Sequence, residues 1–204
     1  MSIHGTNQYD RRRPGKRHRT FRRRPGAPLQ QGQLDGLCGV YSAINALSLL
    51  AERGRPFPLT AAMALYREAI ELVAVKGSLS GVTTYGLDTP LWLAVIRRLA
   101  RRVETDQSIT LAISRPFQHR PKAGFGRLRR AIEAALEQDA IVLVSLTGAH
   151  SHYTVIRAYT ASRFVLHDSS GLRWLSIAAC GTSYSRQRHQ IAASWLIVIK
   201  VAGA

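Results

Sequence analysis

The stretch Gln33-Leu-Asp-Gly-Leu-Cys38-Gly-Val-Tyr-Ser-Ala-Ile-Asn-Ala-Leu-Ser-Leu-Leu50 decides the fold of this chain. Apolar residues recur at helical spacing after Cys38, namely Val40, Ile44 and Leu47, and this spacing predicts a helix. Asp35 is placed to cap its start, and the glycines at 36 and 39 allow a tight turn. We therefore expect Cys38 at the N-terminus of a helix with an apolar face.

A cysteine at a helix N-terminus is suited to nucleophilic chemistry. The partial positive charge there favours the thiolate, which is the form that attacks a carbonyl carbon. Backbone N–H groups at the same place can hold an oxyanion, and the side-chain amide of Gln33 is our candidate for a further donor. Gln31 competes with Gln33 for this role. The alternative is that Cys38 is a small apolar residue buried in a core helix.

A thiol also needs a neighbouring base, and the stretch 152–168 supplies the candidates. His152 opens one predicted strand and Asp168 closes the next, and the two ends lie side by side if the strands are antiparallel. The carboxylate would then hold the imidazole in one orientation. His150 competes with His152, which we prefer because the strand pattern starts beside it. We expect His167 to point away from Asp168 and to be structural or exposed.

The rest of the pattern predicts helices first and strands afterwards. Thr60 is expected to cap a helix over 61–75, a further helix starts near Asp88 and Pro90, and another spans 128–138. Strands are predicted at 109–113, 141–146, 153–159, 163–167, 173–177 and 195–201, with loops at 76–86 and 178–193. This order predicts an α+β fold with an N-terminal helical lobe and an antiparallel β-sheet lobe.

Charge divides the chain into two parts. The net charge is +17 over 204 residues. Residues 1–28 hold nine Arg and Lys against one acid, and they have few apolar side chains. We interpret 1–28 as a disordered Arg-rich basic arm and 29–204 as one globular domain. The arm is either a solubilising tail or an electrostatic attachment to nucleic acid, an acidic protein or an anionic surface.

Several further expectations follow from composition. Two cysteines do not make a disulfide framework, and a free Cys38 thiol favours the cytoplasm. The chain has no apolar leader segment and no run long enough to span a membrane, so we expect a soluble protein. The spacing of Cys and His gives no metal site, and no cofactor is indicated. We expect Cys180 to be incidental and Trp174 to pack in the core, with shielding of the His–Asp pair as its alternative role. The arginines at 97, 98, 101 and 102 are expected to form a solvated helix face.

The order Gln33, Cys38-Gly39, His152-Tyr-Thr-Val and Asp168 resembles the papain-like cysteine peptidases. The Gln spacing and the Leu-Cys…Asn-Ala-Leu run are similar to Josephin-type deubiquitinases. The Cys-Gly pair and the Gly-x-x-x-His-Tyr pattern are similar to bacterial peptidases that cleave double-glycine leaders. The resemblance covers roughly residues 30–175, whereas the arm and residues 178–193 match nothing in these families.

The resemblance implies a papain-like fold and a thiol protease that hydrolyses a peptide or isopeptide bond through a thioester. Cys38 would be the nucleophile, His152 the base and then the acid, and Asp168 the group that orients His152. The substrate would be a ubiquitin-like protein or a Gly-Gly-type leader. Two alternatives stay open, namely a transglutaminase-like acyltransferase or deamidase, and a basic nucleic-acid-binding module on an inactive peptidase scaffold.

Overall fold

The computed structural model describes residues 26–32, 35–52 and 57–203. Its helices are α1 (Cys38–Ala51), α2 (Leu59–Lys76), α3 (Leu79–Tyr85), α4 (Thr89–Gln107) and α5 (Phe125–Glu137). Its strands are β1 (Leu111–Ser114), β2 (Ile141–Gly148), β3 (His152–Tyr159), β4 (Arg163–Leu166), β5 (Trp174–Ser176), β6 (Cys180–Thr182), β7 (His189–Ile191) and β8 (Ile197–Val201). Two short 3₁₀ turns, η1 (Ile177–Ala179) and η2 (Ala193–Trp195), complete the described elements.

The strands form one mainly antiparallel sheet. Its order is β1-β8-β2-β3-β4-β5, and every neighbouring pair in this series is antiparallel. β7 lies against the end of β2 and pairs in parallel with β6. The predicted mixture of helices and an antiparallel sheet is therefore confirmed, while the finer assignment to a papain-like fold stays a prediction.

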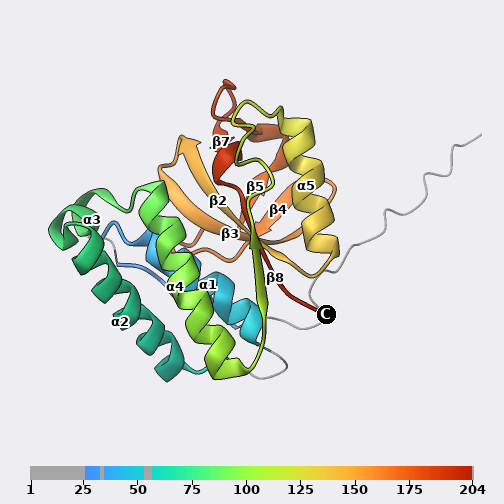
Figure 1. Ribbon diagram of the computed structural model, residues 1–204. Coiled ribbons are helices and arrows are strands. Elements are labelled where there is room, and N and C mark those ends of the chain that lie inside the picture. Colours follow the sequence, from blue (N-terminus) through green and yellow to red (C-terminus); the bar gives the residue numbers. More distant parts are fainter. Residues whose placement is uncertain (1–25, 33–34, 53–56, 204) are drawn as a thin grey trace, which may run out of the picture.

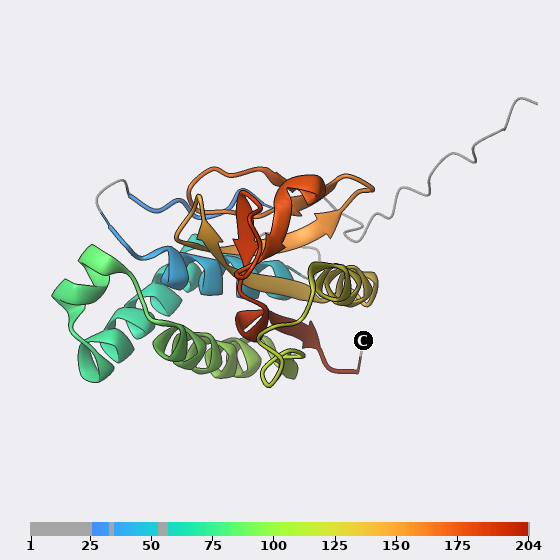
Figure 2. The same ribbon diagram turned by 90° about the horizontal axis from the view of Figure 1, so that it is seen from above.

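Helices cover both faces of the central strand β2. Successive strand residues point to opposite faces, and Leu143 accordingly joins the core with α1, α2 and α4, whereas Val142 and Val144 join the core with α5. Figure 1 shows the four N-terminal helices grouped on one side of the sheet and α5 on the other. The view from above in Figure 2 shows the same separation. This arrangement explains why the sequence of β2 is a continuous apolar run.

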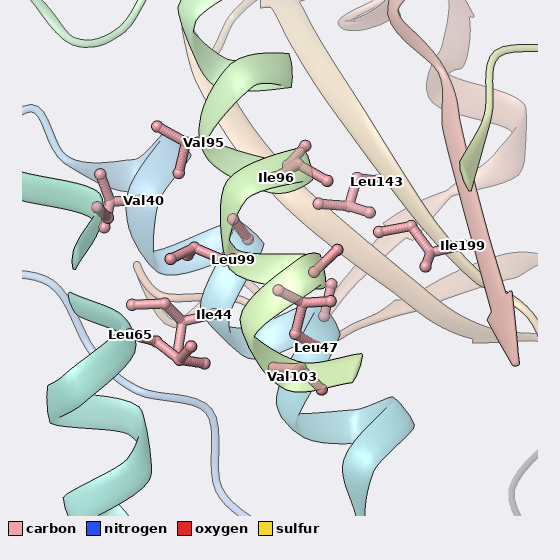
Figure 3. Close-up of a cluster of buried hydrophobic side chains, with 14 of the residues drawn as sticks. Val40, Ile44, Leu47, Leu65, Val95, Ile96, Leu99, Val103, Leu143 and Ile199 are labelled. Atoms are coloured by element: carbon pink, nitrogen blue, oxygen red, sulfur yellow. The ribbon is translucent and has the colours of Figure 1, made fainter. Parts of the chain in front are cut away.

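Helix α1 is the centre of the larger core. Every residue of α1 except Tyr41 is buried. In Figure 3, Ile44 and Leu47 of α1 lie among Leu65 of α2, Leu99 of α4 and side chains of the sheet. Burying a side chain of this size contributes roughly 1.5–3 kcal/mol. The helix that carries Cys38 at its tip is therefore held rigidly by apolar packing on all sides.

The sequence-based boundaries were wrong in two loops. Residues 76–86, predicted as a loop, contain α3, whose N-cap Ser78 accepts a hydrogen bond from the Gly81 amide at 3.0 Å. Residues 178–193, predicted as a polar loop, contain β6 and β7. Strands of three residues give little periodic signal. These two are stabilised by pairing with each other, and β7 also pairs with β2. The expected strand near 109–113 and the helix start at Asp88 are confirmed.

Two predicted helix caps were also wrong. α2 begins at Leu59 with Pro58 in the N-cap position, not at a cap provided by Thr60. The N-cap of α1 is Leu37, without a side-chain cap. Asp35 instead accepts hydrogen bonds from the Leu37 amide at 3.1 Å and the Gly32 amide at 2.8 Å. The carboxylate therefore stabilises the turn before the helix rather than the helix itself.

Trp174 does not pack in the core. Its side chain is 46% exposed, and the guanidinium of Arg163 lies 4.1 Å from its ring centre. The arginine row of α4 is exposed as expected, and part of it is ion-paired, with Arg98 bonded to Glu68 and Arg102 to Asp106. Most of the Arg-rich arm, residues 1–25, lies outside the described residues.

Candidate active site

Three elements converge on the residues that the sequence singled out. α1 begins at Cys38, and β3 begins at His152. β3 and β4 are antiparallel, and the His167 amide continues the ladder beyond β4 by donating to the Val155 carbonyl at 2.9 Å. Asp168 follows directly, so the end of this segment runs beside the start of β3. The contact predicted between residues separated by 16 positions is therefore present.

The His152–Asp168 pair is tightly held. His152 Nε2 lies 2.6 Å from Asp168 Oδ1, and the two side chains are 9% and 0% exposed. The other carboxylate oxygen accepts hydrogen bonds from the backbone amides of Ser170 at 2.8 Å and Leu172 at 3.0 Å. The turn after Asp168 thus fixes the carboxylate, which in turn fixes the imidazole.

Charge stabilises the protonated ring. Burial by itself lowers the pKa of His152, but hydrogen bonds with Asp168 and Cys38, and the charges of both, raise this pKa to about 9. Burial likewise raises the pKa of Asp168, yet its hydrogen bonds with His152 and with the Leu172 amide hold that pKa below its usual value. Opposite charges are therefore favoured on the pair at neutral pH.

Cys38 acts on the same imidazole. Its side-chain interaction with the ring and its charge are among the causes that raise the pKa of His152. Because Nε2 is engaged with Asp168, Nδ1 is the ring nitrogen left for the thiol. Cys38 is 9% exposed, and it is a free cysteine in the first turn of α1. The structure therefore shows the His152–Asp168 contact directly, and the raised pKa of His152 links Cys38 to the same ring.

An aromatic cluster positions the tip of α1 against β3. Trp92 Nε1 donates to the Gly39 carbonyl at 3.1 Å, and the rings of Trp92 and Tyr153 lie 4.2 Å apart. The Tyr153 hydroxyl donates to the Leu87 carbonyl at 3.0 Å. A Cβ at position 39 would lie 3.0–3.2 Å from Leu87, Trp92 and Tyr153. Glycine beside Cys38 therefore permits close packing, a role that sequence reasoning missed because it assigned Gly39 to a turn.

A short N-terminal segment ties α1 to the turn after Asp168. The Leu29 amide donates to Asn45 Oδ1 at 2.8 Å, and Asn45 Nδ2 donates to the Leu29 carbonyl at 3.1 Å. Two residues later, the Gln31 amide donates to the Ser169 carbonyl at 3.1 Å. From the sequence, Asn45 was noted only as part of the Leu-Cys…Asn-Ala-Leu run. Its polar side chain within an apolar helix was the signal that could have revealed this tie.

The structure describes one of the two candidate oxyanion donors, Gln31, but not the other, Gln33. Gln33 lies outside the described residues, so its role stays a prediction. Gln31 has both ends of its side-chain amide engaged, since Nε2 donates to the Asp35 carbonyl at 3.3 Å and Oε1 accepts from the Ser169 hydroxyl at 3.0 Å. These bonds make Gln31 a structural link between the turn before Cys38 and the turn after Asp168.

The competing residues lie elsewhere or are inert. The ring of His150 stacks on the ring of His189, with the ring centres 5.3 Å apart. The histidine that is hydrogen-bonded to Asp168 is His152. His167 is buried, which fits the structural one of its two expected roles, and burial and Arg157 lower its pKa to about 4. Cys180 is buried, and burial raises the pKa of its thiol to about 11. Of the two cysteines, Cys38 is therefore the one that interacts with the His152–Asp168 pair.

Within the part of the chain that the structure describes, no helix combines the length and the apolar character needed to cross a membrane. The described residues also contain no cluster of three or more His, Cys, Asp or Glu suited to holding a metal ion. Searches against models of known protein families and against curated proteins gave no match to this chain.

Proposed function

We propose that this protein is a cysteine peptidase that hydrolyses a peptide or isopeptide bond through a thioester. The observation that supports the proposal best is the buried His152–Asp168 pair, with Nε2 2.6 Å from Oδ1. Cys38 also contributes to the raised pKa of the same His152 ring. A nucleophile, a base and a group that orients the base are the minimum set for acyl transfer at a thiol. The sequence resemblance to papain-like peptidases points to the same chemistry.

The raised pKa of His152 determines where the proton starts. With a pKa of about 9, the His152 ring carries its second proton at neutral pH. In the proposed mechanism Cys38 attacks as the thiolate, the form that a helix N-terminus favours. The thiolate then attacks the substrate carbonyl without a further proton transfer. The backbone N–H groups of the first turn of α1, which lack intrahelical acceptors, are the donors for the tetrahedral oxyanion. Gln33 is proposed as an additional donor.

His152 then acts as the general acid. Its proton passes to the leaving amine as the carbon–nitrogen bond breaks, and the acyl group remains on Cys38 as a thioester. The now neutral imidazole takes a proton from water, and the resulting hydroxide-like oxygen attacks the thioester carbonyl. Departure of the Cys38 thiolate releases the acid, and the thiolate beside the imidazolium formed in the preceding step is the starting state. Asp168 stays ionised throughout and stabilises the positive ring.

The test is covalent labelling with an electrophilic peptide probe that ends in Gly-Gly, the substrate class that the resemblance suggests. We expect the wild-type protein to be labelled at Cys38, and the Cys38→Ser variant to remain unlabelled. Cys180→Ser is the matched control, because burial raises the pKa of the Cys180 thiol to about 11 and this thiol should not react. His152→Ala should slow labelling by roughly 10²-fold or more, as expected for loss of a general acid–base group.

Hydrolysis is tested separately from labelling. A peptide in which a fluorescent amine follows Gly-Gly should release the amine with the wild-type protein and not with Cys38→Ser. Labelling that occurs at Cys180, or that persists equally in the His152→Ala variant, would contradict the proposed site. Labelling at Cys38 without amine release from any such peptide would leave the nucleophile in place and refute this substrate class.

A further inference from the structure

A second site is suggested by a cavity of about 750 Å³ on the outer face of β3, β4 and β5. Phe164 and Leu175 of these strands point inward to the core that α5 covers, while Arg163, Val165 and Trp174 line the cavity on the opposite face. Neither Cys38 nor His152 lines it. Its size is within the range of small-molecule sites. The cavity is therefore separate from the proposed nucleophile.

The cavity is strongly basic. Arg157, Arg163 and Arg173 contribute to its wall. Asp168 is the one acidic residue among the described residues that line the cavity, and its carboxylate is bonded to His152 and to two backbone amides. Burial lowers the pKa of Arg157, which indicates that this guanidinium is partly removed from water. Three cations at one cavity favour an anionic ligand.

Trp174 adds a flat stacking surface to this basic wall. Its side chain is 46% exposed at the cavity, and Arg163 lies over the ring at 4.1 Å. An exposed indole beside a guanidinium plane is the combination on which nucleobases stack, while neighbouring arginines bind the phosphodiesters. An acidic peptide would use the arginines but would gain little from the indole.

The Arg-rich arm joins the described chain at this cavity. Gly26, the residue that follows segment 1–25, lines it together with Pro28. All nine Arg and Lys of the arm fall between positions 11 and 24. The most basic segment of the sequence therefore ends just before Gly26, a residue of the cavity wall.

From these observations we propose that the cavity binds single-stranded nucleic acid. The phosphodiesters contact Arg163 and Arg173, and one base stacks at Trp174. The proposed binding uses neither Cys38 nor His152, although Asp168 of the candidate active site forms part of the cavity wall. It assigns a function to the outer face of β4 and β5.

Fluorescence anisotropy of the full-length protein with a short fluorescein-labelled oligothymidylate tests this proposal. We expect Trp174→Ala to weaken binding at least about fivefold, the effect of losing one stacked base. Tyr184→Ala is the matched control, because Tyr184 is 67% exposed and does not line the cavity; it should change the affinity less than about twofold. Unchanged circular dichroism and melting temperature will show that the variants are folded.

Salt dependence separates the cavity from the rest of the basic surface. For Arg173→Ala, the slope of log K against log salt concentration should fall by about 0.7, the value for one lost contact with a single strand. Arg101→Ala, an exposed position on α4, serves as the control and should leave the slope unchanged. Equal binding by all variants would assign the binding to the arm and overturn the proposal. An unchanged affinity of Trp174→Ala, with polyglutamate competing as well as the unlabelled oligonucleotide, would overturn it in favour of an acidic peptide.

Discussion

Replacing Asp168 by asparagine probes the charge on which the candidate site depends. The substitution keeps the size of the side chain and removes its negative charge. The remaining oxygen can still accept the amides of Ser170 and Leu172, which now bind Oδ2 at 2.8 and 3.0 Å. The turn that presents residue 168 should therefore keep its shape. The expected effect is electrostatic and is located at His152.

The structure gives the magnitude of this effect. The pKa of His152 stands at about 9, against an ordinary value of 6.5. This difference corresponds to about 3 kcal/mol in favour of the protonated ring. Burial lowers the pKa of His152, whereas Asp168 and Cys38 raise it, and Asp168 has the larger of these two raising effects. Without the carboxylate we expect the pKa of His152 to fall by at least about 1 unit.

The same shift predicts a pH dependence of stability. Because the folded-state pKa is raised, its contribution is fully present below pH 6.5 and is lost as the pH rises through about 9. This group should lower the unfolding free energy of the wild-type protein by up to about 3 kcal/mol across that interval. In Asp168→Asn the decline should be smaller and should end at a lower pH.

Two measurements check this reasoning. NMR titration of the His152 imidazole gives its pKa, and urea unfolding at several pH values between 6 and 10 gives the stability. Asp106→Asn is the matched control, since Asp106 pairs with Arg102 on the exposed face of α4 and should leave both curves unchanged. An unaltered His152 titration in Asp168→Asn would refute the view that this carboxylate holds the proton on the ring.

Three further substitutions test the packing around the site. Asn45→Ala leaves a backbone N–H and C=O of the N-terminal segment without their side-chain partner and should cost about 1–3 kcal/mol in urea unfolding; a loss below about 0.5 kcal/mol would contradict the tie. Gly36→Ala would place a methyl carbon 2.7 Å from the Gly86 backbone nitrogen and should lower the melting temperature, whereas Gly126→Ala, with 3.8 Å to its nearest neighbour, should be neutral or stabilising. The pKa of His167 is lowered to about 4. The unfolded state therefore binds more protons than the folded state between pH 6.5 and 4, and the free energy of unfolding of the wild-type protein should fall by up to about 3 kcal/mol on acidification. The His167→Gln variant should lack this part of the loss of stability. If the free energy of unfolding of both proteins fell by the same amount between pH 7 and 5, the predicted contribution of His167 would be wrong.

The sequence by itself determined which residues belong to the candidate site. Helical spacing after Cys38 gave the start of α1, and alternating apolar residues gave β3 and β4. Local patterns of this kind come from one side chain and its near neighbours in the chain, so they can be read without the fold. The antiparallel pairing then followed from the short turn between the strands, and it brought His152 beside Asp168.

Only the tertiary structure decided how these residues are held. The bond from Asn45 to Leu29, the close packing of Gly39 against Trp92, and the exposure of Trp174 join positions that are far apart in sequence or depend on which face is covered. The short strand β7 forms because β2 offers it a partner, and β6 forms because it pairs with β7. Such features depend on the sum of distant contacts, and no local pattern records them. The sequence therefore named the chemical groups, and packing around α1 set their positions.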